Sequence, residues 1–454
     1  MKQRIILTVA CLAIFFEALD VSVLNMALPQ MEQYFDFSPD AIQWVQTVYV
    51  LLYAGFVLLG GRLSDTIGRR NIFIAGALLF VLASFAAGFS LSFEWLLVCR
   101  GLQGVGVAFA IPAAMSVISH TFTDPAEKNR AFGVFGAMAG IGFATGLAIG
   151  GLISAYLGWQ WVFFINVPVI GIAIILARKF IPADIKREET ISSNVPSGML
   201  ISLLMLLAAW LIHDLGHITH HPVVYLSLLF LFVFMGLYFI RRERVHPFPL
   251  VDFSIFSLQG VITGNTGAML LGGIFLPYIF LLTLYLQHQL HFSSSQAGLL
   301  LFPFSILSGL ISKFVLPHLF NRFGVERTGI IGNACMLSGI LFFIVSYFSA
   351  YPLPFIICAV LCINSMGMSV TFPCVTILAI QHVPASQHGL ASGVNGTANA
   401  MGGGLGLSLT GLAMQVAGMM DWNVYGVGLS VLAALGLIAI GQLYVYMKQV
   451  PAAG

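Results

Sequence analysis

The chain has 454 residues, of which 59% are hydrophobic and only 8% are charged, and its formal net charge is +2. Soluble globular proteins carry about 25% charged residues, so this composition excludes a water-soluble enzyme, a disordered chain and a nucleic-acid-binding protein. Because each helical crossing of a bilayer needs about 20 apolar residues, the chain has room for many membrane-spanning helices.

Apolar segments of spanning length follow one another along the whole chain and predict an all-α polytopic membrane protein. The fourteen predicted spans are 5–28, 41–61, 71–92, 94–119, 130–156, 159–178, 196–214, 222–240, 259–287, 294–317, 329–349, 352–378, 388–414 and 422–446. Glu17 and Asp20 interrupt the first apolar run and no small-residue cleavage site follows. We therefore interpret that run as a membrane helix and not as a secretion signal. The six cysteines lie inside apolar segments, as small hydrophobic residues do.

The positions of the basic residues test this count independently. Lysine and arginine concentrate in short cytoplasmic loops. With both termini in the cytoplasm, seventeen of the nineteen basic residues fall in cytoplasmic segments and none falls in an outer loop. The remaining two, Arg100 and Lys313, lie within spans, and Lys313 is close enough to the inner end to extend to the interface. The tryptophans cluster near the outer helix ends, as an interfacial belt would place them.

The two halves of the chain share sequence features, which predicts an internal repeat. The loop after the second span reads GRLSDTIGRR, the loop after the tenth reads LFNRFGVER, and spans 5 and 13 are both glycine-striped. Parallel repeats with a site at their interface are a transporter design. The predicted organisation is a six-helix half (1–180), a cytoplasmic linker (181–195), a two-helix insert (196–240), a second linker (241–258) and a second six-helix half (259–454).

Ionisable side chains within the spans are the first candidates for function, because each costs at least about 2.5 kcal/mol at a helix centre. Glu17 and Asp20 are three residues apart in the first span and share a helical face. Two carboxylates this close in a low dielectric do not both ionise easily, so one is expected to hold a proton near neutral pH, as a proton carrier must. The alternative for each is a hydrogen bond to a neighbouring helix.

Depth in the membrane indicates which cation meets these acids. At 1.5 Å per residue, Asp20 lies about 12 Å from the outer end of its span, and Arg100 lies about 9 Å below the same surface. We therefore predict that Arg100 pairs with Asp20 and releases it when Asp20 or Glu17 is protonated.

Two glycine-containing patterns are further candidates. In the GRLSDTIGRR loop, Gly61 and Gly68 allow tight turns, Asp65 can cap a helix or bind an arginine, and Arg69 and Arg70 are cytoplasmic anchors. This cluster can latch one conformation by charge pairing; the alternative is an ordinary basic loop. In span 5, the small residues Gly142, Gly146, Gly150 and Gly151 predict close helix packing.

A group of histidines at the outer end of span 7 could bind zinc by its spacing. His213, His217 and His221 are four residues apart. However, Gly216 and Pro222 favour a loop, so we interpret the group as a solvated turn and expect neither a metal site nor a cofactor.

The sequence resembles the major facilitator superfamily over essentially its whole length, and within it the fourteen-span drug:proton antiporter family. The motifs that carry the resemblance are LDVSVLNMALP (19–29), GRLSDTIGRR (61–70), RGLQGVGVAFAIPA (100–113), GFATGLAIGG (142–151) and WQWVFFINVP (159–168). Thr66 and Leu147 stand where the family usually has a basic residue and a proline. The resemblance implies that Asp20 is the membrane-embedded acid, that Arg100 takes part in proton coupling, and that the span-5 glycines form the antiporter signature.

These observations predict a proton-coupled exporter of small amphipathic or cationic compounds, working by alternating access in the cell membrane. Its partners would be a small-molecule substrate, protons and the lipid bilayer, with no nucleic acid, and we expect a monomer. The alternatives are an exporter of one metabolite or siderophore and a proton symporter. A membrane receptor or scaffold is disfavoured because it gains nothing from buried charges. An enzyme is disfavoured because the spans show no nucleophile–base pair.

Overall fold

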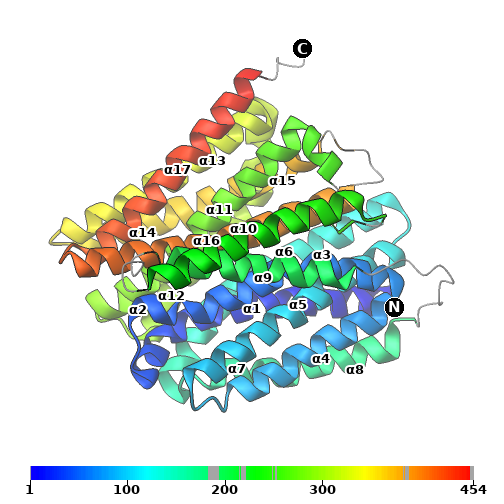
Figure 1. Cartoon of the computed structure of the whole chain (residues 1–454), viewed down its shortest axis with the longest axis horizontal. Coiled ribbons are helices and arrows are strands. Elements are labelled where there is room, and N and C mark those ends of the chain that lie inside the picture. The colour runs from blue at the N-terminus through cyan, green and yellow to red at the C-terminus, as the bar shows by residue number, and fades with distance from the viewer. Residues whose placement is uncertain are drawn as a thin grey trace. The chain divides into compact units, whose positions relative to one another are not determined.

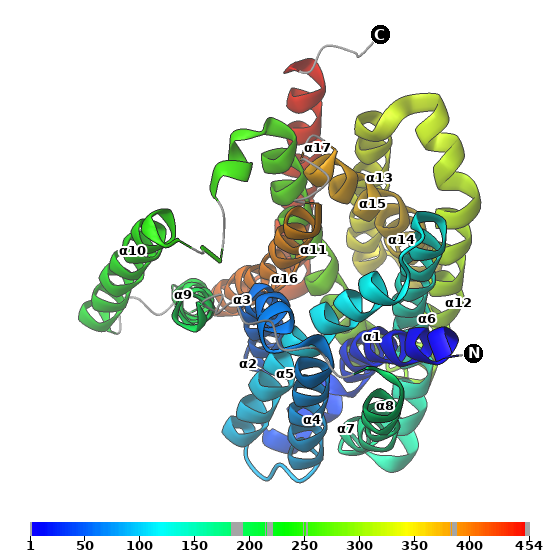
Figure 2. The same ribbon diagram turned by 90° about the vertical axis from the view of Figure 1, so that its right-hand side faces the viewer.

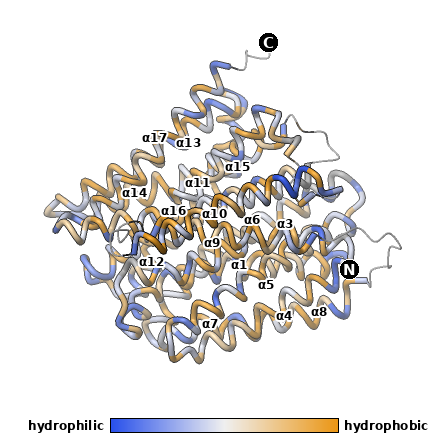
Figure 3. Tube along the Cα trace, viewed as in Figure 1, coloured by the Kyte–Doolittle hydropathy of each residue, from blue (hydrophilic) through white to orange (hydrophobic). Residues whose placement is uncertain are grey.

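A computed structural model describes residues 2–182, 194–213, 215, 221–247, 249–250, 253–381, 383 and 388–449. These residues form helices joined by short connections, and the described part of the chain has no strand (Figure 1). The helices are hydrophobic along most of their length, and hydrophilic residues gather at their ends (Figure 3). The predicted all-helical membrane fold is therefore confirmed.

The first predicted spans appear as long helices with short connections. They are α1 (Lys2–Phe35), α3 (Trp44–Thr66), α4 (Arg69–Ala87), α5 (Phe93–Thr121), α6 (Pro125–Leu157) and α8 (Asn166–Phe180), with the short helices α2 (Pro39–Ile42) and α7 (Trp161–Phe164). Local chemistry sets where α5 and α6 begin. The Ser92 hydroxyl accepts the Trp95 N–H at 3.2 Å, and the Asp124 carboxylate accepts the Glu127 N–H at 2.9 Å. Each satisfies a donor that the first turn leaves free.

The remaining spans follow in the predicted order. They are α9 (Val195–His213), α10 (Pro222–Val245), α11 (Gln259–Leu284), α12 (Ser294–Leu310), α13 (Leu316–Phe348), α14 (Pro352–Val360), α15 (Met368–Ile380), α16 (His388–Met419) and α17 (Val424–Gln449). A 3-10 turn at Phe253–Ser257 precedes α11. Wider π-helical turns at Tyr285–Gln289, Ile311–Val315 and Leu361–Gly367 extend or join these helices.

Thirteen helical runs of the described residues are long and apolar enough to cross a membrane. One of them, Ser294–Phe348, has 55 residues, which at 1.5 Å per residue is about 80 Å and far exceeds a hydrocarbon core of about 30 Å. Gly324 breaks this run with φ 75° and ψ 175°, a conformation that glycine adopts without strain. The break at Gly324 falls between the two spans predicted at 294–317 and 329–349, and the count of fourteen crossings stays a prediction.

The chain separates into two compact units. The first comprises Met1–Leu207, Phe232–Leu250 and Leu286–Phe302, and the second comprises Ala208–Leu231, Val251–Tyr285 and Pro303–Gly454. Because these units follow packing and not chain order, the predicted boundaries of the halves, linkers and insert stay a prediction.

Helices of the two units pack in the same internal pattern. In the first unit, α1 packs against α5, α6 and α8, and α4 packs against α5 and α8 (Figure 2). In the second unit, α11 packs against α15, α16 and α17, and α13 packs against α15 and α17. This correspondence agrees with a repeated six-helix design. In the first unit, α5, α6 and α8 pack directly against α1, which carries the acids predicted in span 1.

A buried carboxylate links the start of α9 to the turn after α10. Glu243 of α10 is 2% exposed. It accepts hydrogen bonds from the Ser197 hydroxyl at 2.5 Å, the Asn194 side-chain amide at 3.1 Å and the Leu250 N–H at 2.5 Å. The same turn offers the Pro249 carbonyl to Arg62 of α3, whose Nη1 donates to it at 2.8 Å. Glu243 thus fastens the turn after α10 to the start of α9.

Candidate functional site

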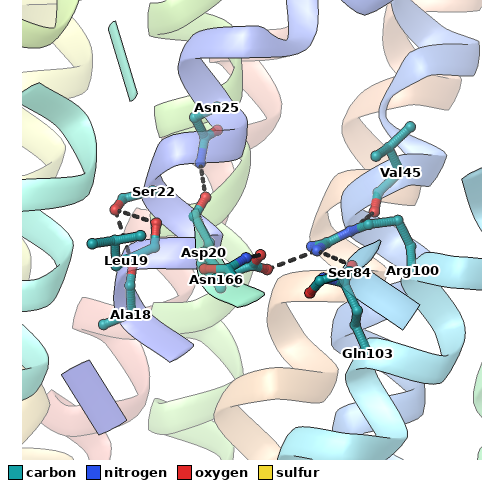
Figure 4. A network of polar contacts seen from close by, with 11 residues as sticks. Ala18, Leu19, Asp20, Ser22, Asn25, Val45, Ser84, Arg100, Gln103 and Asn166 are labelled. Carbon is teal, nitrogen blue, oxygen red and sulfur yellow. Dashed lines mark hydrogen bonds and ion pairs between the residues drawn. The ribbon is translucent and has the colours of Figure 1, made fainter. Parts of the chain in front are cut away.

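Asp20 lies at the centre of a polar network that is otherwise surrounded by apolar helices. Its side chain points from α1 toward α5, and Arg100 of α5 reaches it with Nη1 2.7 Å from Oδ2 (Figure 4). Asp20 is 1% exposed and Arg100 is 0% exposed. The predicted ion pair between these two residues is therefore confirmed, and it lies in a water-excluded interior.

Each oxygen of the Asp20 carboxylate has a different partner. Oδ2 accepts from Arg100, while Oδ1 accepts from the side-chain amide of Asn166, the first residue of α8, at 2.7 Å (Figure 4). Charge-assisted hydrogen bonds of this length stabilise the ionised carboxylate. The arrangement holds a negative charge at Asp20 without exposure to water.

The guanidinium of Arg100 is itself held on three sides. Its Nε donates to the Val45 carbonyl at 3.1 Å, its Nη1 also donates to the Gln103 side chain at 2.8 Å, and its Cζ lies 4.2 Å from the centre of the Tyr49 ring. Gln103 in turn donates to the Ser84 hydroxyl at 2.6 Å. The network therefore joins α1, α3, α4, α5 and α8, so a change in the charge of Asp20 acts on five helices at once.

Glu17 is not part of the ion pair. It is half-buried one turn before Asp20, and among the described residues its carboxylate has no hydrogen-bond or ion-pair partner. It lines a cavity of about 30 Å³ whose walls are apolar and include Phe16, Phe73, Phe80 and Ile111. A cavity of this size is large enough to admit a water molecule. Glu17 and Asp20 both belong to α1 and lie one turn apart, as predicted. Their carboxylates nevertheless have different neighbours.

The GRLSDTIGRR loop connects α3 to α4 by a tight turn. Gly68, immediately before α4, has φ 114°, where a side chain would be strained, whereas Gly61 lies inside α3 without a positive φ. Arg69 and Arg70 begin α4, and Arg70 Nη1 donates to the Ile181 carbonyl at 3.5 Å. Asp65 lies in α3, and its side chain lies outside the described part of the structure. The latching role of the loop stays a prediction.

The span-5 glycines lie where α6 meets α1. A Cβ atom added to Gly142 would meet the Phe15 carbonyl, and one added to Gly146 would meet the Ser22 hydroxyl and the Leu19 carbonyl. Gly150 faces Val23 in the same way, and Gly151 faces the backbone of Ser294 in α12. The predicted close packing is confirmed, and α1 is its main partner; a role in the direction of transport is a separate prediction.

Two other candidates from the sequence occupy different settings. His213 ends α9 and His221 is exposed directly before α10, but His217 lies outside the described residues, so the predicted histidine turn stays a prediction. Within the described residues, no three metal-binding side chains gather to hold an ion. Lys313 is exposed in the π-helical turn before α13, with Nζ 5.2 Å from the centre of the Phe314 ring, which agrees with a side chain that extends toward the interface.

The neutral members of the network, Asn166 above all, were not predicted from the sequence. The depth argument that pairs Arg100 with Asp20 also applies to Asn166, which lies seven residues into the sixth predicted span, about 10 Å from the same surface. Gln103 has a signal too, because it follows Arg100 by one helical turn. A neutral amide inside a span costs less than a charge, so its signal in the sequence is weaker.

Known proteins resemble this chain over most of its length. The family model of the Major Facilitator Superfamily matches it in two overlapping stretches, residues 10–279 and 263–453. The chain belongs to the Major Facilitator Superfamily. It is thus a multi-pass membrane transporter and not an enzyme.

Relatives within the superfamily include resistance proteins. The chain is 29% identical over 442 residues to the lincomycin resistance protein of Streptomyces lincolnensis, covering 93% of this chain and 86% of that protein. It is 29% identical over 419 residues to the multidrug resistance protein Stp of Mycobacterium tuberculosis, covering 90% and 75%. A crystal structure of a peptide transporter in complex with sulfate shares the fold, with a TM-score of 0.73, 13% identity, and coverage of 98% and 94%.

Proposed function

We propose that this transporter exports small amphipathic or cationic compounds in exchange for protons, and that Asp20 is the residue that binds the transported proton. The observation that carries the proposal is the buried Asp20–Arg100 pair, 2.7 Å long, in a superfamily member related to drug resistance proteins. A membrane protein keeps such a pair at considerable cost, so an intramembrane pair indicates function.

The coupling follows from the charges. When Asp20 is ionised, Arg100 and Asn166 hold it and the five joined helices are fixed together. When Asp20 takes up a proton, the Coulomb attraction to Arg100 is lost and α1 can move relative to α5. Antiport requires that the proton and the substrate oppose each other through these states. Glu17 is proposed as a second acid that exchanges protons through its small cavity.

The two glycine-containing patterns receive mechanical roles in this proposal. The Gly142, Gly146 and Gly150 face makes α6 move together with α1, so a movement of the acid-bearing helix is passed on to α6. The loop motif with Asp65 and Gly68 would latch the cytoplasmic ends of α3 and α4 in one state. We further propose that the chain acts as a monomer in the cell membrane with both termini in the cytoplasm, because that orientation puts its basic loops inside.

The energy available is sufficient for export. One charge crossing 100 mV releases about 2.3 kcal/mol, which is roughly a fifty-fold concentration ratio at 1.4 kcal/mol per factor of ten. Exchange of one proton for one neutral compound can therefore maintain a gradient of that size, whereas one-for-one exchange with a singly charged cation moves no net charge and is driven by the pH difference alone.

A liposome experiment tests the proposal. The purified protein is reconstituted, a pH gradient or a sodium gradient is imposed, and the flux of ethidium, a fluorescent amphipathic cation, is followed. We expect ethidium to move toward the acidic side when the pH gradient is imposed and to ignore sodium. Movement with the protons would indicate symport, and flux that follows sodium or needs no gradient would reject proton exchange.

A narrower function is the second candidate, because one relative is named for a single compound, lincomycin, while another is named for multidrug resistance. A dedicated exporter and a multidrug exporter differ in whether chemically unrelated compounds compete for transport. Chemically unrelated cations should inhibit ethidium flux in a multidrug exporter and leave transport unchanged in a dedicated one.

A further inference from the structure

Asn166 is the neutral side chain that donates a hydrogen bond to the Asp20 carboxylate. It is 0% exposed, and its Nδ2 donates to Asp20 Oδ1 at 2.7 Å. The other side of the same amide, Oδ1, is buried and has no hydrogen-bond partner among the described residues. Buried polar atoms are nearly always paired, so this unused acceptor beside a titrating acid needs an explanation.

The two partners of Asp20 differ in what they can do. The guanidinium of Arg100 carries only donors, so it cannot accept the O–H of the protonated carboxyl group. The amide of Asn166 carries a donor group and an acceptor of nearly the same size and shape. In the observed orientation it donates to Oδ1. Rotation of the amide by 180° about its terminal torsion would exchange its nitrogen and its oxygen. The Asn166 Oδ1 atom would then face Asp20.

We propose that Asn166 is the positioning residue that keeps Asp20 hydrogen-bonded in both protonation states by turning its amide. A hydronium ion from the aqueous phase transfers its proton to Asp20 Oδ1: one O–H bond of the hydronium ion breaks, one O–H bond forms at Oδ1, and a water molecule is released. The amide then turns so that its oxygen accepts that O–H. The inference rests on the proposed function, because it assumes that Asp20 takes up a proton.

The surroundings leave few other groups for this task. The ionisable side chains close to Asp20 are Arg100 of α5, Tyr49 of α3 and Glu17 of α1, with Tyr53 beside Glu17. Of the helices packed against α8, α4 carries ionisable groups only at its cytoplasmic start and α7 carries none. On α1, the other charged groups near Asn166 are limited to Glu17, since Arg4 and Glu32 lie toward its two ends.

The consequence concerns the barrier to proton exchange. Protonation of Asp20 cancels its ion pair, and with an apolar side chain at position 166 the new O–H would lose the partner that Oδ1 has in the described structure. An unsatisfied buried donor is costly. A side chain that serves both states removes that cost, so Asp20 can gain and lose its proton without leaving a buried group unpaired. Only an amide, a hydroxyl or an imidazole can serve in this way.

Acid-induced infrared difference spectra of the full-length protein in liposomes test this inference. Such spectra show the carbonyl band of a protonated, buried carboxylic acid and, with ¹³C-labelled asparagine, the amide that responds to it. The band that Asp20→Asn removes is assigned to Asp20. We expect an asparagine amide signal to accompany this band in the wild type and to disappear in Asn166→Leu.

The Asn166→Leu variant should also shift the Asp20 band to the frequency of a carboxyl group without a hydrogen bond. Because the ionised state loses the stronger bond, the pH at which half of the band has appeared should rise by roughly 0.5 to 1 unit. Asn166→Ser retains a donor and an acceptor, so its pH midpoint should lie between those of Asn166→Leu and the wild type. This variant also provides the test if Asn166→Leu does not fold.

Asn25→Leu is the matched control. Asn25 is equally buried and also lies close to Asp20 along α1, but its amide donates to the Val21 carbonyl at 2.8 Å (Figure 4), so its loss should leave the Asp20 band and its pH midpoint unchanged. A wild-type Asp20 band that neither Asn166 variant alters overturns this inference alone. The absence of any Asp20 band in the wild type overturns the proposed function together with it.

Discussion

Replacing Arg100 with methionine removes the cation of the buried pair while keeping much of its apolar volume. The two atoms of the pair are 2.7 Å apart, so at an effective dielectric constant of about 20 their attraction is about 6 kcal/mol before the cost of desolvation. Removing one partner of a buried pair leaves the other charge uncompensated and costs about 3–5 kcal/mol. We expect Arg100→Met to destabilise the protein by this amount.

A double variant measures the interaction between Asp20 and Arg100 apart from the other contacts of each side chain. Asp20→Asn alone leaves Arg100 buried with its bonds to Val45 and Gln103, so it should also destabilise. Asp20→Asn with Arg100→Met removes both charges, and replacing a whole buried pair is often close to neutral. The double variant should therefore be more stable than Arg100→Met, with a coupling energy of at least about 2 kcal/mol.

The chain provides its own reporters for the measurement. Cys11 and Cys99 are buried in the first unit, so a thiol-reactive fluorophore follows its unfolding in detergent. Lys313→Met is the matched control, because Lys313 is exposed and its removal should change stability by less than about 0.5 kcal/mol. Additive single variants, within about 0.5 kcal/mol, would refute the claim that Asp20 and Arg100 act as a stabilising pair.

Three further changes probe the framework with the same unfolding assay. Gly146→Ala should lower the free energy of unfolding by about 1–3 kcal/mol, because the new methyl group overpacks against Ser22 and Leu19. Gly140→Ala should not lower it, because the space around a new Cβ is open there. Equal effects would contradict the tight α1–α6 contact. Gly68→Ala should cost about 1–3 kcal/mol because φ is 114° there, and Gly61→Ala, which meets only Pro112 at 3.7 Å, should be tolerated. Glu243→Gln should cost about 1–3 kcal/mol, because the amide nitrogen that replaces Oε2 cannot accept the Leu250 N–H. The exposed Glu94→Gln should have little effect. A stable Glu243→Gln protein would show that the turn at Leu250 holds without the carboxylate.

The membrane helices and the Asp20–Arg100 pair could be predicted because both rest on strong constraints. An apolar run long enough to span a bilayer has few other uses, and a chain with two intramembrane cations leaves few choices for a buried acid. The rise per residue of a helix converts position in the sequence into depth in the membrane. That depth alone puts Asp20 and Arg100 at the same level.

The surroundings of Glu17 could not be predicted in the same way. Spacing places Glu17 and Asp20 on one side of α1, but three residues still differ by about 60° around a helix of 3.6 residues per turn. That difference turns Asp20 toward Arg100 and Glu17 toward an apolar cavity lined by Phe73, Phe80 and other side chains of α4, α5 and α8. Which neighbour each residue meets depends on packing between helices distant in sequence.

Contacts between segments far apart in the chain could not be predicted from the sequence either. The bond from Arg62 to the Pro249 carbonyl spans 187 residues, and no periodicity or motif connects the two positions. The linker around 241–258 was predicted as a basic cytoplasmic segment, whereas the structure shows that Glu243, an acid within it, is the group that orders the turn.

The most direct test of the central claim compares two kinds of flux in liposomes containing the Asp20→Asn variant. Exchange of labelled for unlabelled ethidium across the membrane needs no proton, whereas accumulation against a gradient driven by acidification does. The account predicts that Asp20→Asn retains exchange and loses accumulation, while the wild type shows both. Undiminished accumulation in Asp20→Asn would contradict the assignment of proton binding to Asp20.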